Sequence, residues 1–165
     1  MRTITAMTCV TPTTAEVSPA MLREQLARWP TGVAVVTATG RDGRPIGKTV
    51  NSFHATSLAP PLVGWCIDHR SSQVDDWLAA PGYVVHVVAA HQGPLMRHFA
   101  TPSADRFAGV AWQPGLDGMP VLDEPVALRL ECRAAHRFAA GDHTYLVGEV
   151  VILTAADAVP LCLQR

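Results

Sequence analysis

The sequence predicts a mostly β domain, a largely antiparallel barrel with short helices at its ends. About six apolar runs of strand type are separated by turn residues, and three or four short helical patterns lie between them. The helical patterns do not alternate regularly with the strands, which argues against a doubly wound parallel sheet and favours an antiparallel barrel. At 165 residues the chain is the length of one domain, which buries roughly 70% of its unfolded surface.

The first elements are an arm and a helix. Residues 1–17 are rich in threonine and aperiodic, so we expect a flexible arm, followed by one domain over residues 18–165. Ser18 and Pro19 have the residue types of an N-cap and a first helical position. One face of the predicted helix is apolar and ends before Pro30; it carries Leu22, Leu26 and Trp29.

Three strands and a hairpin turn are predicted in the next part of the chain. Val33–Ala38 is a β-branched run, and an Asp-Gly pair at 42–43 is typical of a hairpin turn. We therefore expect Thr49–Phe53 to pair back as the second strand. Leu62–Ile67 has the continuous apolar character of a buried strand.

The remaining elements include two short helices and two long strands. Helices are predicted at Ser72–Ala80 and Leu95–Ala100, with a central strand at 83–88 between them and a loop at 115–120. Residues 126–133 alternate between apolar and polar types, which predicts a strand with one wet face that carries Arg129, Glu131 and Arg133. Thr144–Thr154 is predicted to be a long strand after a Gly-Asp turn.

Composition excludes several functional classes. Apolar residues make up 48% and charged residues 16%, which excludes a disordered chain. Thirteen basic and fourteen acidic residues give a net charge of −1, which argues against a nucleic-acid partner. Few charges beside many apolar residues indicate a second subunit, so we expect a homodimer. No apolar stretch reaches about 18 residues and no signal peptide is recognisable, so we expect no membrane contact and a cytoplasmic location.

The sequence lacks the common catalytic and metal-binding motifs. It contains no GxxxxGK[ST], GxGxxG, HExxH or GxSxG pattern, and its four cysteines form no CxxC pair. We expect reduced thiols and no metal site. The protein is therefore either not an enzyme, or a bound cofactor carries its chemistry.

A series of short motifs follows in a fixed order along the chain: Pro30–Thr37, Gly47–Phe53, Ser57–Val63, Asp105–Val110 with Trp112, Gly118–Leu122, Glu131–Arg133, Gly141–His143 and Gly148–Val150. In this joint order the motifs resemble the flavin reductase-like family, the reductase components of two-component flavin monooxygenases. The resemblance extends from Met21 to Arg165 and implies an antiparallel split β-barrel of the FMN-binding type.

The resemblance implies three groups of flavin-binding residues. The isoalloxazine ring would be lined by Gly47, Lys48, Thr49, Asn51 and Ser52. The segment of Cys66, Ile67, Asp68, Ser71 and Ser72 would hold the phosphate where a helix begins, with Arg70 adding charge. A competing interpretation makes Ser72 and Asp75 a capping box of that helix. The third group, near the flavin, is His98 and Phe99.

His143 would lie over the flavin and touch the nicotinamide, where its role is placement. Two residues depart from the family pattern: His86 stands in a buried strand where Asn is frequent, and Trp65 stands where smaller residues are usual. A buried His needs hydrogen-bond partners.

The resemblance implies an NAD(P)H:flavin oxidoreductase that transfers hydride from the nicotinamide to flavin N5 and supplies reduced flavin to a partner monooxygenase. The flavin is FMN or FAD, and the reductant is NADH or NADPH. Two alternatives are a flavin-retaining oxidoreductase acting directly on an organic substrate and a non-catalytic flavin-binding module.

Overall fold

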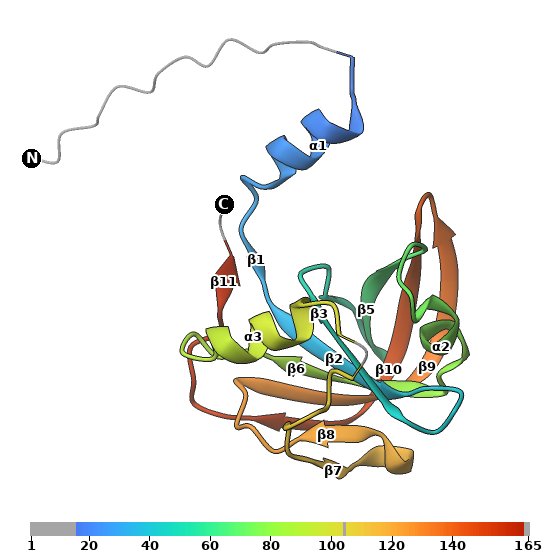
Figure 1. Ribbon diagram of the computed structural model, residues 1–165, viewed down its shortest axis with the longest axis vertical. Coiled ribbons are helices and arrows are strands. Elements are labelled where there is room, and N and C mark those ends of the chain that lie inside the picture. The colour runs from blue at the N-terminus through green and yellow to red at the C-terminus, as the bar shows by residue number, and fades with distance from the viewer. Residues whose placement is uncertain (1–15, 104, 164–165) are drawn as a thin grey trace, which may run out of the picture.

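A seven-stranded antiparallel sheet forms the body of the protein. The structure is a computed structural model that describes residues 16–103 and 105–163 (Figure 1). The predicted arm at 1–17 therefore lies almost wholly outside the described residues. Strand order in the sheet is β3-β2-β6-β9-β10-β5-β4, with bounds β2 Ala34–Thr39, β3 Pro45–Val50, β4 His54–Leu58, β5 Pro61–Asp68, β6 Gly82–Val87, β9 Leu128–Ala140 and β10 His143–Ala155.

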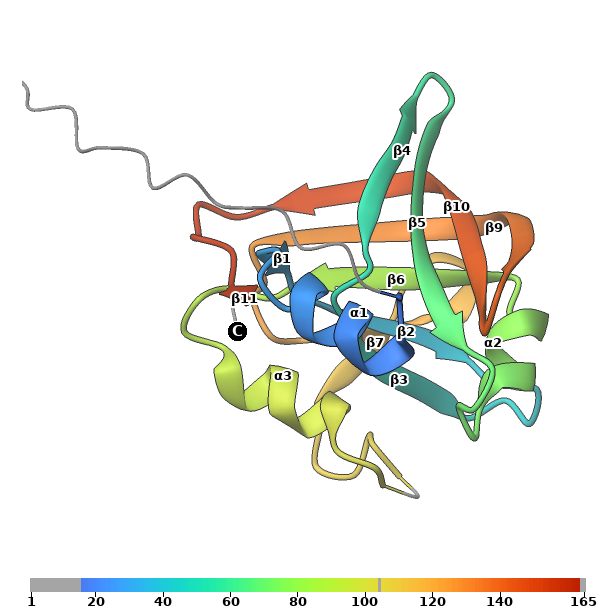
Figure 2. The same cartoon turned by 90° about the horizontal axis from the view of Figure 1, so that it is seen from above.

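Two small sheets and three short helices complete the described chain. The small sheets pair β1 with β11 and β7 with β8, and the helices lie around the large sheet (Figures 1 and 2). The bounds are β1 Thr31–Gly32, β11 Cys162–Leu163, β7 Trp112–Pro114, β8 Pro120–Leu122, α1 Pro19–Leu26, α2 Val74–Ala79 and α3 Gly93–Ala100. The predicted class, mostly β and antiparallel with short helices, is confirmed. No helix in the described ranges is long and apolar enough to cross a membrane.

The first hairpin differs in register from the prediction. Its second strand is β3 at Pro45–Val50, not Thr49–Phe53, because pairing begins directly after the turn with Thr39 opposite Pro45. Gly43 adopts a φ of 79°, and Gly40 N–H donates to the Arg44 carbonyl. The segment that was expected to extend this strand leads instead into β4.

Edge strand β4 and the β7–β8 hairpin were not predicted. Most residues of β4 are exposed, and its sequence has no alternating apolar pattern. It is held by antiparallel pairing to β5, with which it forms a hairpin that projects from the sheet (Figure 2). The loop predicted at 115–120 is the tight connection inside the β7–β8 hairpin, but it contains a short 3-10 helix at Leu116–Gly118, and Pro120 already belongs to β8.

The main core lies between the inner face of the sheet and α2. Trp65 of β5 is fully buried and packs edge-to-face against Trp77 and Tyr83, with ring centroids 5.0 and 5.9 Å apart. Aromatic rings in this arrangement add to the stabilisation that burial provides. The unusual Trp at position 65 is therefore a core residue.

His86 is completely buried and has two partners. Its ring lies 3.2 Å from the Val35 carbonyl through Nδ1, and Leu122 N–H donates to Nε2 at 3.1 Å. A carbonyl accepts only, so Nδ1 carries the hydrogen and the ring is neutral. Burial lowers the pKa of His86 to about 3. The residue thus links β6 to β2 and to the end of β8.

Glu131 was predicted on the solvent-exposed face of β9, and this prediction is wrong, because Glu131 is 4% exposed. Its carboxylate accepts from Leu116 N–H at 2.7 Å and pairs with Arg129 at 3.4 Å. A buried carboxylate needs such partners. The β7–β8 connection covers this part of β9, which the alternation of residue types alone does not reveal.

Helix α1 stands away from the sheet (Figure 1). Ser18 caps it as predicted, since its hydroxyl accepts from Met21 N–H at 3.2 Å. The helix ends at Leu26, before Pro30. Leu22 and Leu26 lie on its predicted apolar face, but Trp29, predicted on the same face, lies beyond the end of the helix. Nothing in the described chain buries these side chains: Leu22, Leu26 and Trp29 are 48%, 60% and 72% exposed.

Candidate functional site

The predicted ring-binding segment on β3 presents its residues to two sides. Gly47 and Thr49 face α3: a Cβ on Gly47 would lie 2.5 Å from the Phe99 ring, and Thr49 Oγ1 donates to the Met96 carbonyl at 2.7 Å. Lys48 alternates to the other side and is half-buried. The close approach that Gly47 allows is thus to Phe99, which is 1% exposed and forms the wall behind the strand.

Lys48 is a half-buried cation beside a second one. Desolvation, followed by the charge of Arg106, lowers the pKa of Lys48. In the described part of the chain, none of the ion pairs involves Lys48. Arg106 donates to Gln73 Oε1 at 2.8 Å and so connects the loop after α3 to the start of α2. An anionic group would relieve the repulsion between the two cations.

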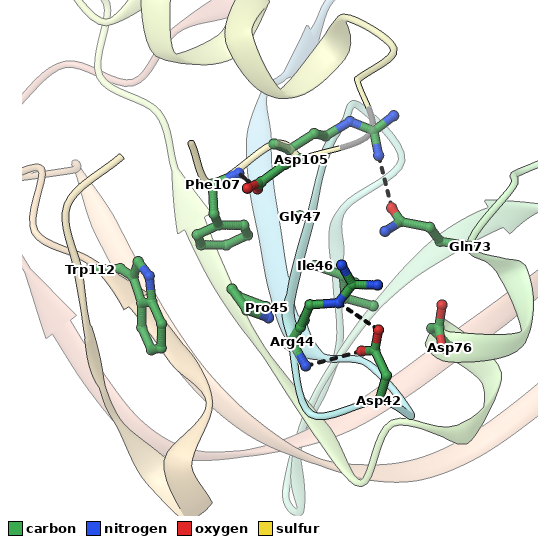
Figure 3. A pocket seen from close by; sticks show the side chains of 11 residues that line it. Asp42, Arg44, Pro45, Ile46, Gly47, Gln73, Asp76, Asp105, Phe107 and Trp112 are labelled. Atoms are coloured by element: carbon green, nitrogen blue, oxygen red, sulfur yellow. Dashed lines mark hydrogen bonds and ion pairs between the residues drawn. The ribbon is translucent and has the colours of Figure 1, made fainter. Parts of the chain in front are cut away.

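Arg106 and Gln73 were not predicted as site residues. The Asp-Arg-Phe motif at 105–107 was recognised only as a mark of the family, and the sequence gives no sign that Gln73 faces it. Both residues line a cavity of about 350 Å³ whose other walls include Gly47, Phe107 and Trp112 (Figure 3). His98 lies behind this loop, where its Nε2–H donates to the Arg106 carbonyl at 2.8 Å.

The segment that was expected to hold a phosphate forms a turn between β5 and α2. Arg70 pairs with Asp68 at 2.8 Å, and its hydrogen bonds hold the pKa of that carboxyl well below its usual range. The charge of Arg70 is therefore already compensated. Ser71 is half-buried in the turn, and its N–H donates to the Asp68 carbonyl at 2.9 Å.

The expectation that Ser72 caps α2 is wrong. The N-cap residue is Gln73, and no side chain caps this helix, so the capping box of Ser72 and Asp75 does not form. The chain needs the extra residue to complete the turn, in which Val74 N–H donates to the Ser71 carbonyl. Ser72 itself is exposed.

Asn51 and Ser52 lie where the chain leaves β3 and crosses to β4. Ser52 Oγ accepts from Cys66 N–H of β5 at 3.0 Å, which ties the crossing to the sheet. Cys66 is half-buried, and burial raises the pKa of its thiol. Ile67 alternates to the inner face and is fully buried, so only its backbone can meet a ligand.

His143 begins β10 directly opposite Asp68 in the register with β5. Its Nδ1–H donates to Asp142 at 2.7 Å. The partner imidazole holds the pKa of the Asp142 carboxyl below its usual value. His143 and Asn51 line one groove, about 570 Å³ in volume, whose opposite wall is the apolar face of α1. The fold thus brings the predicted nicotinamide residue and a predicted flavin residue together.

The family model described as "Flavin reductase like domain" matches residues 26–165. The chain belongs to the flavin reductase-like family. This match covers most of the chain, and it confirms the family that the sequence motifs indicated.

Several flavin reductase-like proteins are similar over most of this chain. The "FMN reductase (NADH) SmoA" of Agrobacterium fabrum is 43% identical over 140 residues, which are 85% of this chain and 79% of that protein. "Flavin-dependent monooxygenase, reductase subunit HsaB" of Mycobacterium tuberculosis is 32% identical over 92% of this chain and 81% of its own length. A Rhizobium meliloti relative is longer, and the chain spans 44% of it.

A solved flavin reductase-like structure has the same fold. The NADH:FAD oxidoreductase SgcE6 of Streptomyces globisporus, solved with NAD and FAD fragments, superposes with a TM-score of 0.82 at 35% identity. The match covers 92% of this chain and 93% of that one.

Proposed function

We propose that this flavin reductase-like protein is an NADH-dependent flavin reductase that supplies reduced flavin to a separate monooxygenase. The observation that carries the proposal is the groove in which Asn51 and His143 meet, on a chain 43% identical to an FMN reductase (NADH). Relatives named as reductase subunits of monooxygenases support the partner enzyme.

The residues present fit a flavin. Among the described residues, neither Lys48 nor Arg106 forms an ion pair, although the charge of Asp68 acts on Lys48. Ser71 lies in the turn after Asp68, and two cations with a hydroxyl suit a phosphate. Asn51 and Ser52 offer hydrogen-bonding groups of the kind that a flavin ring needs. Gly47, Thr49 and Phe99 support β3 from behind.

Flavin, when bound, supplies the hydride acceptor that the chain itself lacks. Lys48 and Arg106 would bind its charged tail, and Ser52 would orient its ring. His143, which lines the groove, would hold the nicotinamide in place, with Asp142 fixing its imidazole by accepting from Nδ1–H. The open groove suits a flavin that enters oxidised and leaves reduced. FMN and FAD both remain candidates, since relatives are named for each.

The proposal includes a homodimer and a cytoplasmic location. The uncovered face of α1 and the exposed side chains of Val151, Ile152 and Leu153 on β10 provide apolar surface for a second copy. The cytoplasm supplies the NADH that such an enzyme consumes.

Steady-state NADH oxidation with and without added FMN or FAD tests the function. We expect turnover that depends on free flavin. A yellow protein that oxidises an organic substrate without NADH would instead indicate a flavin-retaining oxidoreductase. Flavin binding without either activity would indicate a binding module.

A further inference from the structure

A polar cluster on the outer face of the sheet lies beside Ser52. In the register of β10 with β5, Tyr145 is opposite Cys66, the residue whose N–H donates to Ser52. Tyr145 hydroxyl lies 2.6 Å from Thr56 Oγ1 and 3.0 Å from His54 Nε2. These residues come from β4 and β10, which are separated by β5.

The directions of the hydrogen bonds in this cluster follow from His54. Its Nδ1 lies 2.9 Å from the Ser52 carbonyl, which only accepts, so Nδ1 carries the hydrogen. In the neutral ring Nε2 then accepts, and Tyr145 must donate to it. Thr56 in turn donates to the Tyr145 oxygen. A directed chain thus runs from Thr56 through Tyr145 and His54 to the carbonyl of Ser52.

Packing holds the rings of His54 and Tyr145 in place. The rings of His54 and Tyr145 are parallel within 3°, with centroids 5.3 Å apart. Tyr145 lies over Gly64, where any Cβ would overlap its hydroxyl. Gly64 is also the register partner of His54 on β5. The absence of a side chain at 64 therefore lets the tyrosine reach β4.

Ser52 needs this support because it lies outside the strands. Its carbonyl is held by His54, and its hydroxyl accepts from Cys66 N–H. Within the residues that the structure describes, this is the one hydrogen bond of the Ser52 hydroxyl. A hydroxyl that accepts in this way keeps its own hydrogen free to donate. Ser52 is thus prepared to donate to an acceptor on a ligand.

We propose that His54 and Tyr145 are positioning residues that aim the Ser52 hydroxyl as a donor to the flavin ring. The inference rests on the proposed function, because it takes the ligand of Ser52 to be a flavin. It adds two residues that do not touch the cofactor and that act only through Ser52.

The test compares flavin dissociation constants and the KM for NADH in Ser52→Ala, Tyr145→Phe and the double variant. Ser52→Ala should weaken binding about tenfold, because it removes the proposed donor itself, and Tyr145→Phe at least about threefold, because it removes the hydroxyl that orients His54. The double variant should bind no more weakly than Ser52→Ala alone, because both changes act on one hydroxyl. The KM for NADH should not change.

Tyr83→Phe is the matched control. It removes the other tyrosine hydroxyl of the chain, which donates to the buried Val63 carbonyl on the inner face, and should leave flavin affinity unchanged. Thermal unfolding of each variant separates misfolding from positioning.

Three results would overturn the inference: wild-type affinity in Tyr145→Phe, losses that multiply in the double variant, or no effect of Ser52→Ala. The proposed function fails separately, if the wild-type protein does not oxidise NADH in the presence of flavin.

Discussion

At the scale of single residues, we expect His143 to hold the cosubstrate. His143 reaches the groove from the start of β10, and Asp142 accepts its Nδ1–H. His143→Ala should raise the KM for NADH and lower kcat, while flavin affinity stays near wild type. A loss of placement can cost up to roughly 100-fold in rate. Stopped-flow measurement of flavin bleaching by NADH gives both parameters.

A normal bleaching rate in His143→Ala at sub-saturating NADH would make His143 an ordinary turn residue. Asp142→Asn serves as the comparison, because its amide oxygen can still accept from Nδ1–H. We expect the KM for NADH and the bleaching rate of this variant to be close to those of the wild-type protein.

A substitution of Ser71 tests the proposed phosphate-binding turn. Ser71→Asp should weaken FMN binding more than tenfold, above about 1.4 kcal/mol, because a carboxylate would face the phosphate. Riboflavin has no phosphate and should bind nearly as well as before. The measurement is a titration of FMN, and separately of riboflavin, into the variant. Equal losses would show that the turn supports the fold and does not contact phosphate.

At the scale of elements, His86 makes the link between β6, β2 and β8 sensitive to acid. Its folded pKa, about 3, lies below the unfolded value near 6.5, so the folded state favours the neutral ring. Its contribution to stability is complete above about pH 6.5 and is lost as the pH falls towards 3, by at most about 1.4 kcal/mol per pH unit.

Urea unfolding between pH 7.5 and 4.5 measures this dependence. His86→Asn removes the titrating group and should flatten the acid side of the stability profile relative to wild type. The exposed His91→Asn should leave the profile unchanged. Parallel profiles for wild type and His86→Asn would contradict the assignment.

Elements with a strong local signal were predictable and elements held by distant partners were not. Ser18 and Pro19 marked the start of α1, and the long run at Thr144–Thr154 after a Gly-Asp turn predicted β10. The polar strand β4 exists because β5 pairs with it, and Glu131 is buried because a distant hairpin covers it. Arg106 and Gln73 meet only in three dimensions, so neither was recognised as part of the site.

For the whole molecule, the uncovered side of α1 leads to a prediction about assembly. We expect a dimer in sedimentation velocity at micromolar concentration, with an interface of at least about 1,600 Å² in total. Leu26→Glu, on the exposed face of α1, should weaken the dimer. Leu58→Glu, on the β4–β5 hairpin, provides the comparison, and an equal effect there would show that α1 is not the interface. If the wild-type protein sediments only as a monomer, the proposed dimer is wrong.

The four tryptophans can serve as intrinsic fluorescence probes. Trp65 and Trp77 are buried in the core, whereas Trp29 and Trp112 are 72% and 39% exposed. Trp112 lines the cavity beside Gly47, so a yellow ligand bound nearby would absorb its emission and quench it. Trp29 lies on the face that a second subunit would cover, and its emission would then shift to the blue. Occupancy and association can thus be followed in one unlabelled sample.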